Sequence, residues 1–218
     1  MNEPSGLHFT EPLPEGVADL RPWFIAIHDL PDEIHWGEFW GNDQPVQLDV
    51  GCGRGLFLFN ASLRNPETNY LGLELEFREG RRTAKRLLKR EAVNARVVGG
   101  DAALVLRKHI PPGTVDAVHV YFPDPWWRKK HRRRRIFTDT FVGLCSRVLK
   151  PGGRLHSWTD VPDYFDIIKA LMDHHDDFET LPPPDEREAE HDMDYQTSFE
   201  RKKRKEGFPI FRGLWQKK

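Results

Sequence analysis

The sequence predicts an α/β protein built on a doubly wound, mostly parallel β-sheet. The first observation is that short runs of β-branched and other apolar residues begin at Val46 and recur along the chain. The second is that segments of helical length separate these runs. Because the alternation occurs five times, we expect parallel strands joined by right-handed crossovers. The five predicted strands cover residues 46–50, 69–74, 95–98, 115–122 and 153–159.

Amphipathic helices are predicted between these strands. Residues 77–88 place small and apolar side chains on one helical face and arginines and lysines elsewhere. A second helix over 136–149 should end at the Lys-Pro-Gly-Gly sequence that follows it, because proline lacks an N–H donor and glycine adopts positive φ. A third helix is expected over 162–174. Residues 178–181 and 210–216 are predicted to be two further strands that close one side of the sheet.

Residues 1–45 and 46–218 differ in character. The first segment is rich in proline and aromatic residues and has weak periodicity. We therefore expect an N-terminal extension that is loosely structured and whose aromatic side chains pack on the body. The second segment is expected to be a single domain, because 218 residues suit one full-sized core with a small appendage.

The composition excludes several classes of protein. The 33 Lys and Arg nearly balance the 34 Asp and Glu, unlike the one-signed charge of chains that stay disordered. Cys52 and Cys145 are too few for a disulfide framework or a cysteine-built zinc site, and the histidines show no ligand spacing, so no metal is expected. No apolar run approaches the roughly 18–20 residues of a membrane helix, and there is no secretory signal. We expect a cytoplasmic protein with no membrane partner.

The charges are segregated along the chain. Residues 128–135 read RKKHRRRR, which we call the basic octet, and residues 201–205 read RKKRK. An acidic stretch over 173–194 lies between them. Two basic patches on an acid-rich background favour a polyanionic partner such as RNA, whereas a solvated loop or a localisation signal is the alternative.

A glycine-rich sequence follows the first predicted strand. Asp49-Val-Gly51-Cys-Gly53-Arg-Gly55 has the spacing G-x-G-x-G, in which glycines allow a sharp turn and close approach to a ligand. Glu74 ends the second strand, where an acid accepts hydrogen bonds from ribose hydroxyls, and Asp101 follows the third, where a carboxylate can bind an adenine amino group. Cys52 stands between two glycines, so we interpret it as a small packing residue rather than a nucleophile.

These strand-end features resemble the class I S-adenosylmethionine-dependent methyltransferases, and the Lys-Pro-Gly-Gly sequence is similar to their connection before strand five. The resemblance implies a Rossmann-like sheet of seven strands with antiparallel last strands and S-adenosylmethionine as cofactor. A ligand without pyrophosphate agrees with the glycine spacing. Asp49, Gly51, Gly53, Glu74 and Asp101 are the residues that would bind it.

A more specific resemblance lies after the fourth strand. Residues 122–135 read FPDPWWRKKHRRRR, and this resembles the tRNA (guanine-N7-)-methyltransferase family. The sequence from Thr197 to Glu200 is similar to the family's T-x-F-E motif, and Thr159-Asp160 to its T-D pair. The resemblance covers the chain from about Trp36 to its end.

The family resemblance implies a role for each matching residue. Asp124 would be catalytic and would contact the cofactor. The residues that would contact guanine or tRNA are Arg128, Asp160, Thr197 and Glu200. Those that would hold the RNA backbone are Lys130, His131, Arg132, Arg133, Arg134 and Arg135. Two positions depart from the family pattern, because Asp49 stands where glutamate is common and Arg128 replaces the usual lysine.

We therefore expect an enzyme that transfers a methyl group from S-adenosylmethionine to N7 of the variable-loop guanine of tRNA. Guanine N7 has a lone pair and no proton, so positioning and electrostatics would supply most of the catalysis. One alternative is a methyltransferase of the same fold with a non-RNA substrate, and another is a non-catalytic RNA-binding protein. Trp126 and Trp127 are candidates for stacking on the base or for packing. Both a monomer and a homodimer remain open.

Overall fold

The computed structural model describes residues 18–184 and 195–218 and has two compact units. The N-terminal unit ends at Pro111 and the C-terminal unit begins at Pro112. Each unit has its own strands and its own buried side chains. The candidate cofactor residues of the sequence lie in the N-terminal unit, and those for guanine and tRNA lie in the C-terminal unit.

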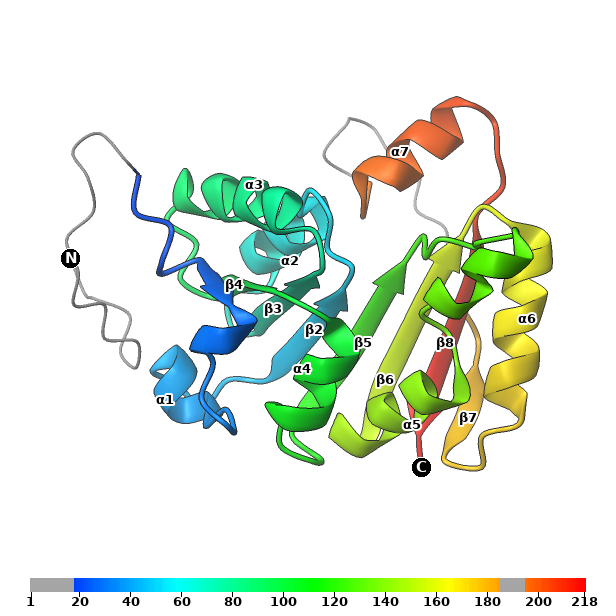
Figure 1. The fold of residues 1–218 in the computed structure, drawn as a ribbon, viewed down its shortest axis with the longest axis horizontal. Helices are drawn as coiled ribbons and strands as arrows, with labels where there is room; N and C mark the ends of the chain where they lie inside the picture. Colours follow the sequence, from blue (N-terminus) through cyan, green and yellow to red (C-terminus); the bar gives the residue numbers. More distant parts are fainter. Residues whose placement is uncertain (1–17, 185–194) are drawn as a thin grey trace. The chain divides into compact units, whose positions relative to one another are not determined.

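The N-terminal unit contains four parallel strands in the order β1-β4-β3-β2. They are β1 (Phe24–Ala26), β2 (Val46–Val50), β3 (Asn69–Glu74) and β4 (Ala95–Gly99). The helices are η1 (Ile27–Asp29), α1 (Trp36–Trp40), α2 (Leu56–Arg64), α3 (Phe77–Leu88) and α4 (Ala102–Lys108). Figure 1 shows α3 running alongside β4 and β3. The alternation predicted for this half of the chain is confirmed.

The prediction of a loosely structured segment before Val46 is wrong for the described residues 18–45. Strand β1 pairs in parallel with β4. Two aromatic side chains of α1 contact a buried arginine of β4. The Arg96 guanidinium lies 4.7 Å from the Phe39 ring centroid and 4.9 Å from that of Trp40, and it donates a hydrogen bond to the Phe39 carbonyl. Burial lowers the Arg96 pKa to about 10. Periodicity missed these elements because they are only three and five residues long.

The C-terminal unit combines one parallel and two antiparallel strand pairs in the order β5-β6-β8-β7. Its strands are β5 (Val115–Tyr121), β6 (Leu149–Thr159), β7 (Phe178–Leu181) and β8 (Phe211–Lys217). Its helices are η2 (Lys129–Arg134), α5 (Asp139–Val148), α6 (Pro162–Asp173) and α7 (Ser198–Lys205). The antiparallel last strands were predicted. With β1, the described residues hold eight strands where seven were expected.

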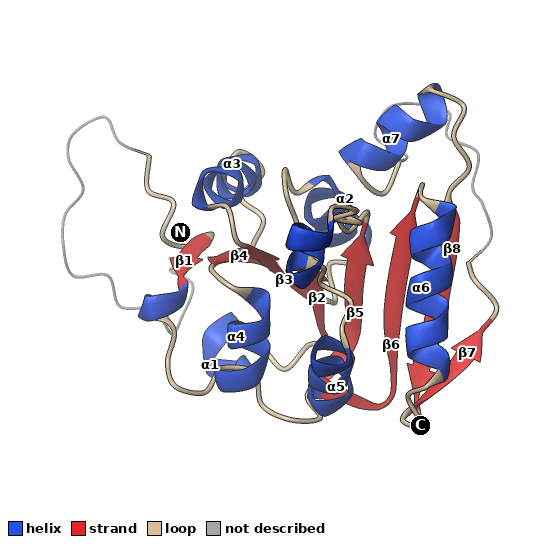
Figure 2. Ribbon diagram, turned by 45° about the vertical axis from the view of Figure 1, so that its right-hand side comes forward, coloured by secondary structure: helices blue, strands red, loops and turns tan. Residues whose placement is uncertain are grey.

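The Lys-Pro-Gly-Gly sequence ends α5 as predicted, although it also belongs to β6. Helix α5 begins after Thr138, whose Oγ1 accepts a hydrogen bond from the Phe141 N–H. Strand β6 starts at Leu149, and its register with β5 shifts before Arg154. Figure 2 shows α6 lying across β6 and β8. The buried residues of this helix are Tyr164, Ile168 and Met172. None of the helices in the described ranges is long and apolar enough to span a membrane.

Candidate active site

The glycine loop after β2 has the conformation that its sequence predicts. Gly51, Gly53 and Gly55 all have positive φ, at 76°, 53° and 66°. A Cβ atom added at Gly51 would have no other atom within 4 Å, so the loop is open on this side. At Gly55 the same atom would lie 2.1 Å from Thr83 Cγ2. The first glycine therefore leaves room for a ligand, and the third allows α3 to approach.

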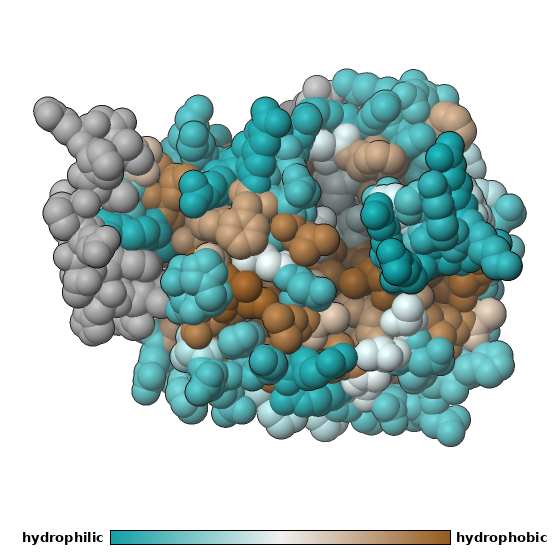
Figure 3. All heavy atoms as spheres, viewed as in Figure 1, coloured by the Kyte–Doolittle hydropathy of each residue, from teal (hydrophilic) through white to brown (hydrophobic). Residues whose placement is uncertain are grey.

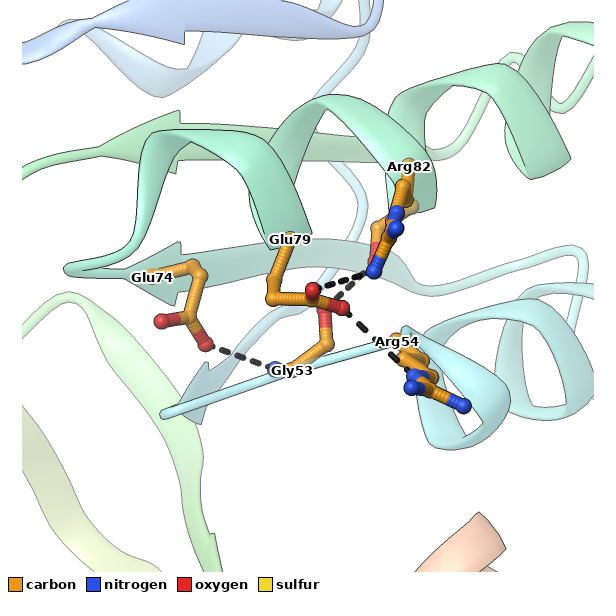
Figure 4. A network of polar contacts seen from close by, with 6 residues as sticks. Gly53, Arg54, Glu74, Glu79 and Arg82 are labelled. Carbon is orange, nitrogen blue, oxygen red and sulfur yellow. Dashed lines mark hydrogen bonds and ion pairs between the residues drawn. The ribbon is translucent and has the colours of Figure 1, made fainter.

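Two side chains hold the loop in place. The Gly53 N–H donates to Glu74 Oε2 at 2.8 Å (Figure 4). Thr83 Oγ1 donates to the Gly53 carbonyl at 2.7 Å. Glu74 Oε1 accepts a second bond, from the Glu76 N–H at 2.9 Å. Glu74 thus lies at the loop, with backbone N–H donors bound to both of its oxygens. Each carboxylate oxygen can accept a further bond, so ribose hydroxyls can still be bound.

Sequence reasoning missed the ion pairs on α3 that lie beside this loop. Glu79 forms one ion pair with Arg82, a turn further along α3, and another with Arg54 of the loop (Figure 4). In the second pair, Arg54 Nε lies 3.6 Å from Glu79 Oε2. The ion pair between Glu79 and Arg82 could have been predicted from their i, i+3 spacing. The ion pair with Arg54 could not be predicted from the sequence, because it depends on how α3 packs against the loop.

Asp49 is the most perturbed acid near the glycine loop. Its side chain is buried, and its Oδ2 has no hydrogen-bond partner among the described residues. Burial, together with the nearby Glu74 charge, raises the pKa of Asp49 to about 8. A buried, unsatisfied carboxyl oxygen favours a ligand with a positive charge or an N–H donor, and S-adenosylmethionine carries both. The residues present fit this cofactor.

Asp101 is the N-cap of α4. Its Oδ1 accepts hydrogen bonds from the Ala103 and Leu104 N–H groups, at 2.8 and 3.2 Å. The side chain is exposed. The sequence therefore placed Asp101 correctly after the third predicted strand, although its capping role accounts for one of the two oxygens.

Cys52 is confirmed as a packing residue. A Cβ atom added at Gly72 of β3 would lie 2.8 Å from the Cys52 sulfur, so the thiol fills the space that this glycine leaves. Burial is the main cause that raises the pKa of Cys52, and the nearby charges of Asp49 and Glu74 raise it further. A thiol that resists ionisation is a poor nucleophile.

In the C-terminal unit, Asp124 lies between two residues whose backbone φ angles are positive. Phe122 has a φ of 53° and Trp126 a φ of 41°, values that side-chain-bearing residues rarely adopt. Phe122 is fixed to β6 through its N–H, which donates to the Trp158 carbonyl at 2.7 Å. The Asp124 side chain between them is exposed. The predicted catalytic acid is thus presented to solvent at the end of β5.

The basic octet forms a hydrophilic surface around η2 (Figure 3). His131 is partly buried, with its ring centroid 5.6 Å from that of Trp126. Arg135 is also partly buried, and its Nε donates to the Pro125 carbonyl at 2.6 Å. The exposed members of the octet are Arg128, Lys129, Lys130, Arg132, Arg133 and Arg134. Most of the octet is therefore accessible to a polyanion.

Thr197 and Glu200 together form a capping box at the start of α7. Thr197 Oγ1 accepts from the Glu200 N–H at 2.9 Å, and Glu200 Oε2 accepts from the Gln196 N–H at 2.7 Å. Glu200 Oε1 accepts from Arg204 at 2.8 Å, and the residue is buried. Burial raises its pKa. The structure brings these two predicted site residues together, with their polar atoms engaged in forming the helix.

Asp160 follows β6 and pairs with α7. Its Oδ2 lies 3.1 Å from Lys203 Nζ, which also lies 4.7 Å from the ring centroid of Phe208. Asp160 therefore helps to dock α7. Within residues 18–184 and 195–218, no group of three or more His, Cys, Asp or Glu could hold a metal ion.

A family described as "Putative methyltransferase" matches residues 43–213. The tRNA (guanine-N(7)-)-methyltransferase of Rhodopirellula baltica is 43% identical over 94% of this chain and 78% of its own length. The enzyme of the same name from Geobacter metallireducens is 31% identical over 82% of this chain and 86% of its own length.

Solved structures support the fold class. An S-adenosylmethionine-dependent methyltransferase from Aquifex aeolicus has a TM-score of 0.57 and 13% identity, and the match covers 80% of this chain and 82% of that one. A geranyl diphosphate C-methyltransferase from Streptomyces coelicolor has a TM-score of 0.55 and 13% identity, over 81% and 70% of the two chains. The predicted doubly wound α/β methyltransferase fold is confirmed. On sequence, the chain belongs to the tRNA (guanine-N(7)-)-methyltransferase family.

Proposed function

We propose that the protein transfers the methyl group of S-adenosylmethionine to N7 of the variable-loop guanine of tRNA. The observation that carries the proposal is the exposed Asp124 carboxylate at the end of β5, followed within a few residues by the mostly exposed basic octet. A carboxylate that can stabilise the positive charge of the transferring methyl group is thus close in sequence to a basic surface that can bind RNA phosphates. The sequence similarity to enzymes named for this activity supports it.

The chemistry makes few demands on proton transfer. The N7 lone pair forms the new bond to carbon, and the bond from that carbon to sulfur breaks with its electrons remaining on sulfur. S-adenosylmethionine supplies the methyl group as a sulfonium. No proton leaves N7, so the protein needs no general base. Its contribution is to align the two reactants and to stabilise the positive charge that moves from sulfur to guanine.

In the N-terminal unit, the proposed cofactor residues each offer a suitable group. The open face of Gly51 and Gly53 allows close approach, and Asp49 offers an unsatisfied oxygen to a cationic group. Glu74 would accept hydrogen bonds from the ribose hydroxyls, and Asp101 would accept one from the adenine amino group. Both carboxylates have lone pairs that their hydrogen bonds to the backbone leave available.

In the C-terminal unit, Asp124 is the proposed catalytic residue, because an exposed carboxylate can both orient guanine and stabilise cationic character. Asp160 would accept from the N1 and N2 donors of guanine while paired with Lys203. We propose that Thr197 and Glu200 act on tRNA mainly through the N-terminus of α7, which they cap. Arg128 and the other exposed cations of the octet would bind phosphates.

A single assay tests the reaction and its alternatives. Incubation with methyl-labelled S-adenosylmethionine and unmodified tRNA should yield 7-methylguanosine, which borohydride treatment converts to a site of strand cleavage. A tRNA with adenine in place of the variable-loop guanine is the matched control and should take up no label. Label in protein or small molecules would instead indicate a non-RNA substrate. Binding of tRNA without transfer would indicate a non-catalytic RNA-binding protein.

Replacement of Asp124 tests the catalytic assignment. Asp124→Ala should lower kcat by about two orders of magnitude or more, in the range that loss of one transition-state contact produces. Its tRNA affinity should change little, because the phosphate contacts remain. Single-turnover methylation and a filter-binding titration would separate the two effects. A variant with the wild-type rate would refute the role of Asp124.

We also propose a cytoplasmic location, where the tRNA substrate is found. Both cysteines are free and buried, so the fold does not depend on an oxidising compartment.

A further inference from the structure

One arginine of the basic octet has different surroundings from its neighbours. Arg132, Arg133 and Arg134 are exposed, whereas the Arg135 side chain is partly buried. The Arg135 guanidinium lies over two aromatic rings, with its central carbon 5.4 Å from the Trp127 centroid and 5.3 Å from the Tyr164 centroid. Contacts of this kind fix the plane and the position of a guanidinium.

The same guanidinium is bonded to the segment that carries Asp124. Arg135 Nε donates to the carbonyl of Pro125, the residue directly after Asp124, at 2.6 Å. Trp127 itself packs edge-on against Tyr164, with the centroids 6.4 Å apart, and Tyr164 is fully buried in α6. Arg135 therefore connects the Asp124 segment to a fixed point in α6.

The backbone around Asp124 needs such a connection. Phe122 and Trp126 both have positive φ, an unfavourable conformation for residues with side chains, and it persists only where contacts on either side enforce it. On the first side, the Phe122 N–H is bonded to β6. On the second side, Arg135 holds the segment through its bond to Pro125 and its stacking on Trp127, while His131 and Arg134 pack against the Trp126 ring.

We propose that Arg135 is a positioning residue that holds the Asp124 carboxylate in place, and that it does not bind phosphate. The octet then has two functions, because its exposed cations bind RNA and its last residue orders the catalytic segment. This proposal rests on the proposed function for the role of Asp124. The ordering of the segment itself is independent of that function and can be measured without substrate.

Arg135→Lys is the discriminating variant. It keeps the positive charge but removes the planar group that stacks on two rings and bonds to Pro125. We expect kcat at saturating tRNA and cofactor to fall about tenfold or more, while the dissociation constant for tRNA changes less than about twofold. Amide hydrogen exchange over residues 122–128 should become faster in the variant without substrate. Arg133→Gln should behave in the opposite way, with weaker tRNA binding and unchanged exchange over 122–128.

The salt dependence of tRNA binding separates a positioning residue from a phosphate ligand. Loss of one phosphate contact lowers the slope of log affinity against log salt by about one, so Arg133→Gln should show this decrease. Arg135→Gln should leave the slope as in the wild type. A slope that falls by about one in Arg135→Gln, with exchange over 122–128 unchanged, would overturn the proposal.

Two further outcomes are informative. If the wild type makes no 7-methylguanosine but Arg135→Lys still loosens residues 122–128, the proposed function fails and the positioning role stands.

If Arg135→Lys does not fold, Trp127→Leu and Trp127→Phe replace it. The phenylalanine keeps a ring beneath the guanidinium and should retain slow exchange, whereas the leucine should not. Equal exchange in these two variants would contradict the positioning role.

Discussion

At the scale of single residues, the proposed contact between Asp49 and the cofactor would make cofactor binding depend on pH. Its pKa of about 8 lies well above the value of 3.8 for an unperturbed carboxyl, so the folded protein retains a proton at pH 7 that the unfolded chain has lost. We expect a cationic cofactor group to displace this proton and to release close to one proton per cofactor bound at pH 7. Calorimetric titration in two buffers of different ionisation enthalpy measures this number, and Asp49→Asn should release none.

The same shift predicts how stability depends on pH. A carboxyl whose pKa is raised on folding stabilises the protein fully below its unfolded pKa, and this contribution is lost as pH rises toward the folded value. Asp49 should therefore lower the free energy of unfolding as pH rises from about 4 to about 8. Asp49→Asn should remove this part of the pH dependence in urea unfolding without cofactor. An unchanged dependence in the variant would show that Asp49 is ionised in the folded protein.

Sequence reasoning placed some of these residues and not others. Asp49, Gly53 and Asp124 stand in local motifs whose backbone follows from glycine or proline, so their positions at strand ends were predictable. Thr83 and Arg135 were not singled out for their structural roles, because each acts through a contact with a distant or folded-back segment. Such contacts depend on how helices and loops pack, which local spacing does not specify.

At the scale of elements, α1 depends on one buried arginine. Replacing Arg96 with methionine removes the cation from the Phe39 and Trp40 rings and leaves the Phe39 carbonyl without this donor. The cost should be about 2–4 kcal/mol of unfolding free energy, from a desolvated cation–π pair and one lost buried hydrogen bond. Urea unfolding monitored by tryptophan fluorescence would measure it.

Arg107→Met is the matched control for this substitution. Arg107 is exposed on α4 in the same unit, and exposed substitutions usually change stability by no more than about 0.5 kcal/mol. Equal, small losses in the two variants would show that α1 is held by its apolar side chains alone.

At the scale of the whole molecule, the distribution of charge matters more than its sum. The chain has a net charge of −1, yet most of the octet is exposed in the C-terminal unit. Affinity for tRNA should therefore fall steeply as salt rises. The double variant Lys130→Gln with Arg132→Gln should lower the slope of log affinity against log salt by about two, while cofactor binding stays unchanged. A slope equal to that of the wild type would place the RNA elsewhere.

The pairing of β1 with β4 also has a consequence for synthesis. Residues 24–26 leave the ribosome about 70 residues before their partner strand, which at roughly 5–20 residues per second is a delay of about 4–14 seconds. During that interval the aromatic side chains before β2 have no partner strand to cover them. Strand β1 can therefore complete its pairing only after β4 has been synthesised, and we expect the aromatic side chains around it to be accessible to chaperones until then.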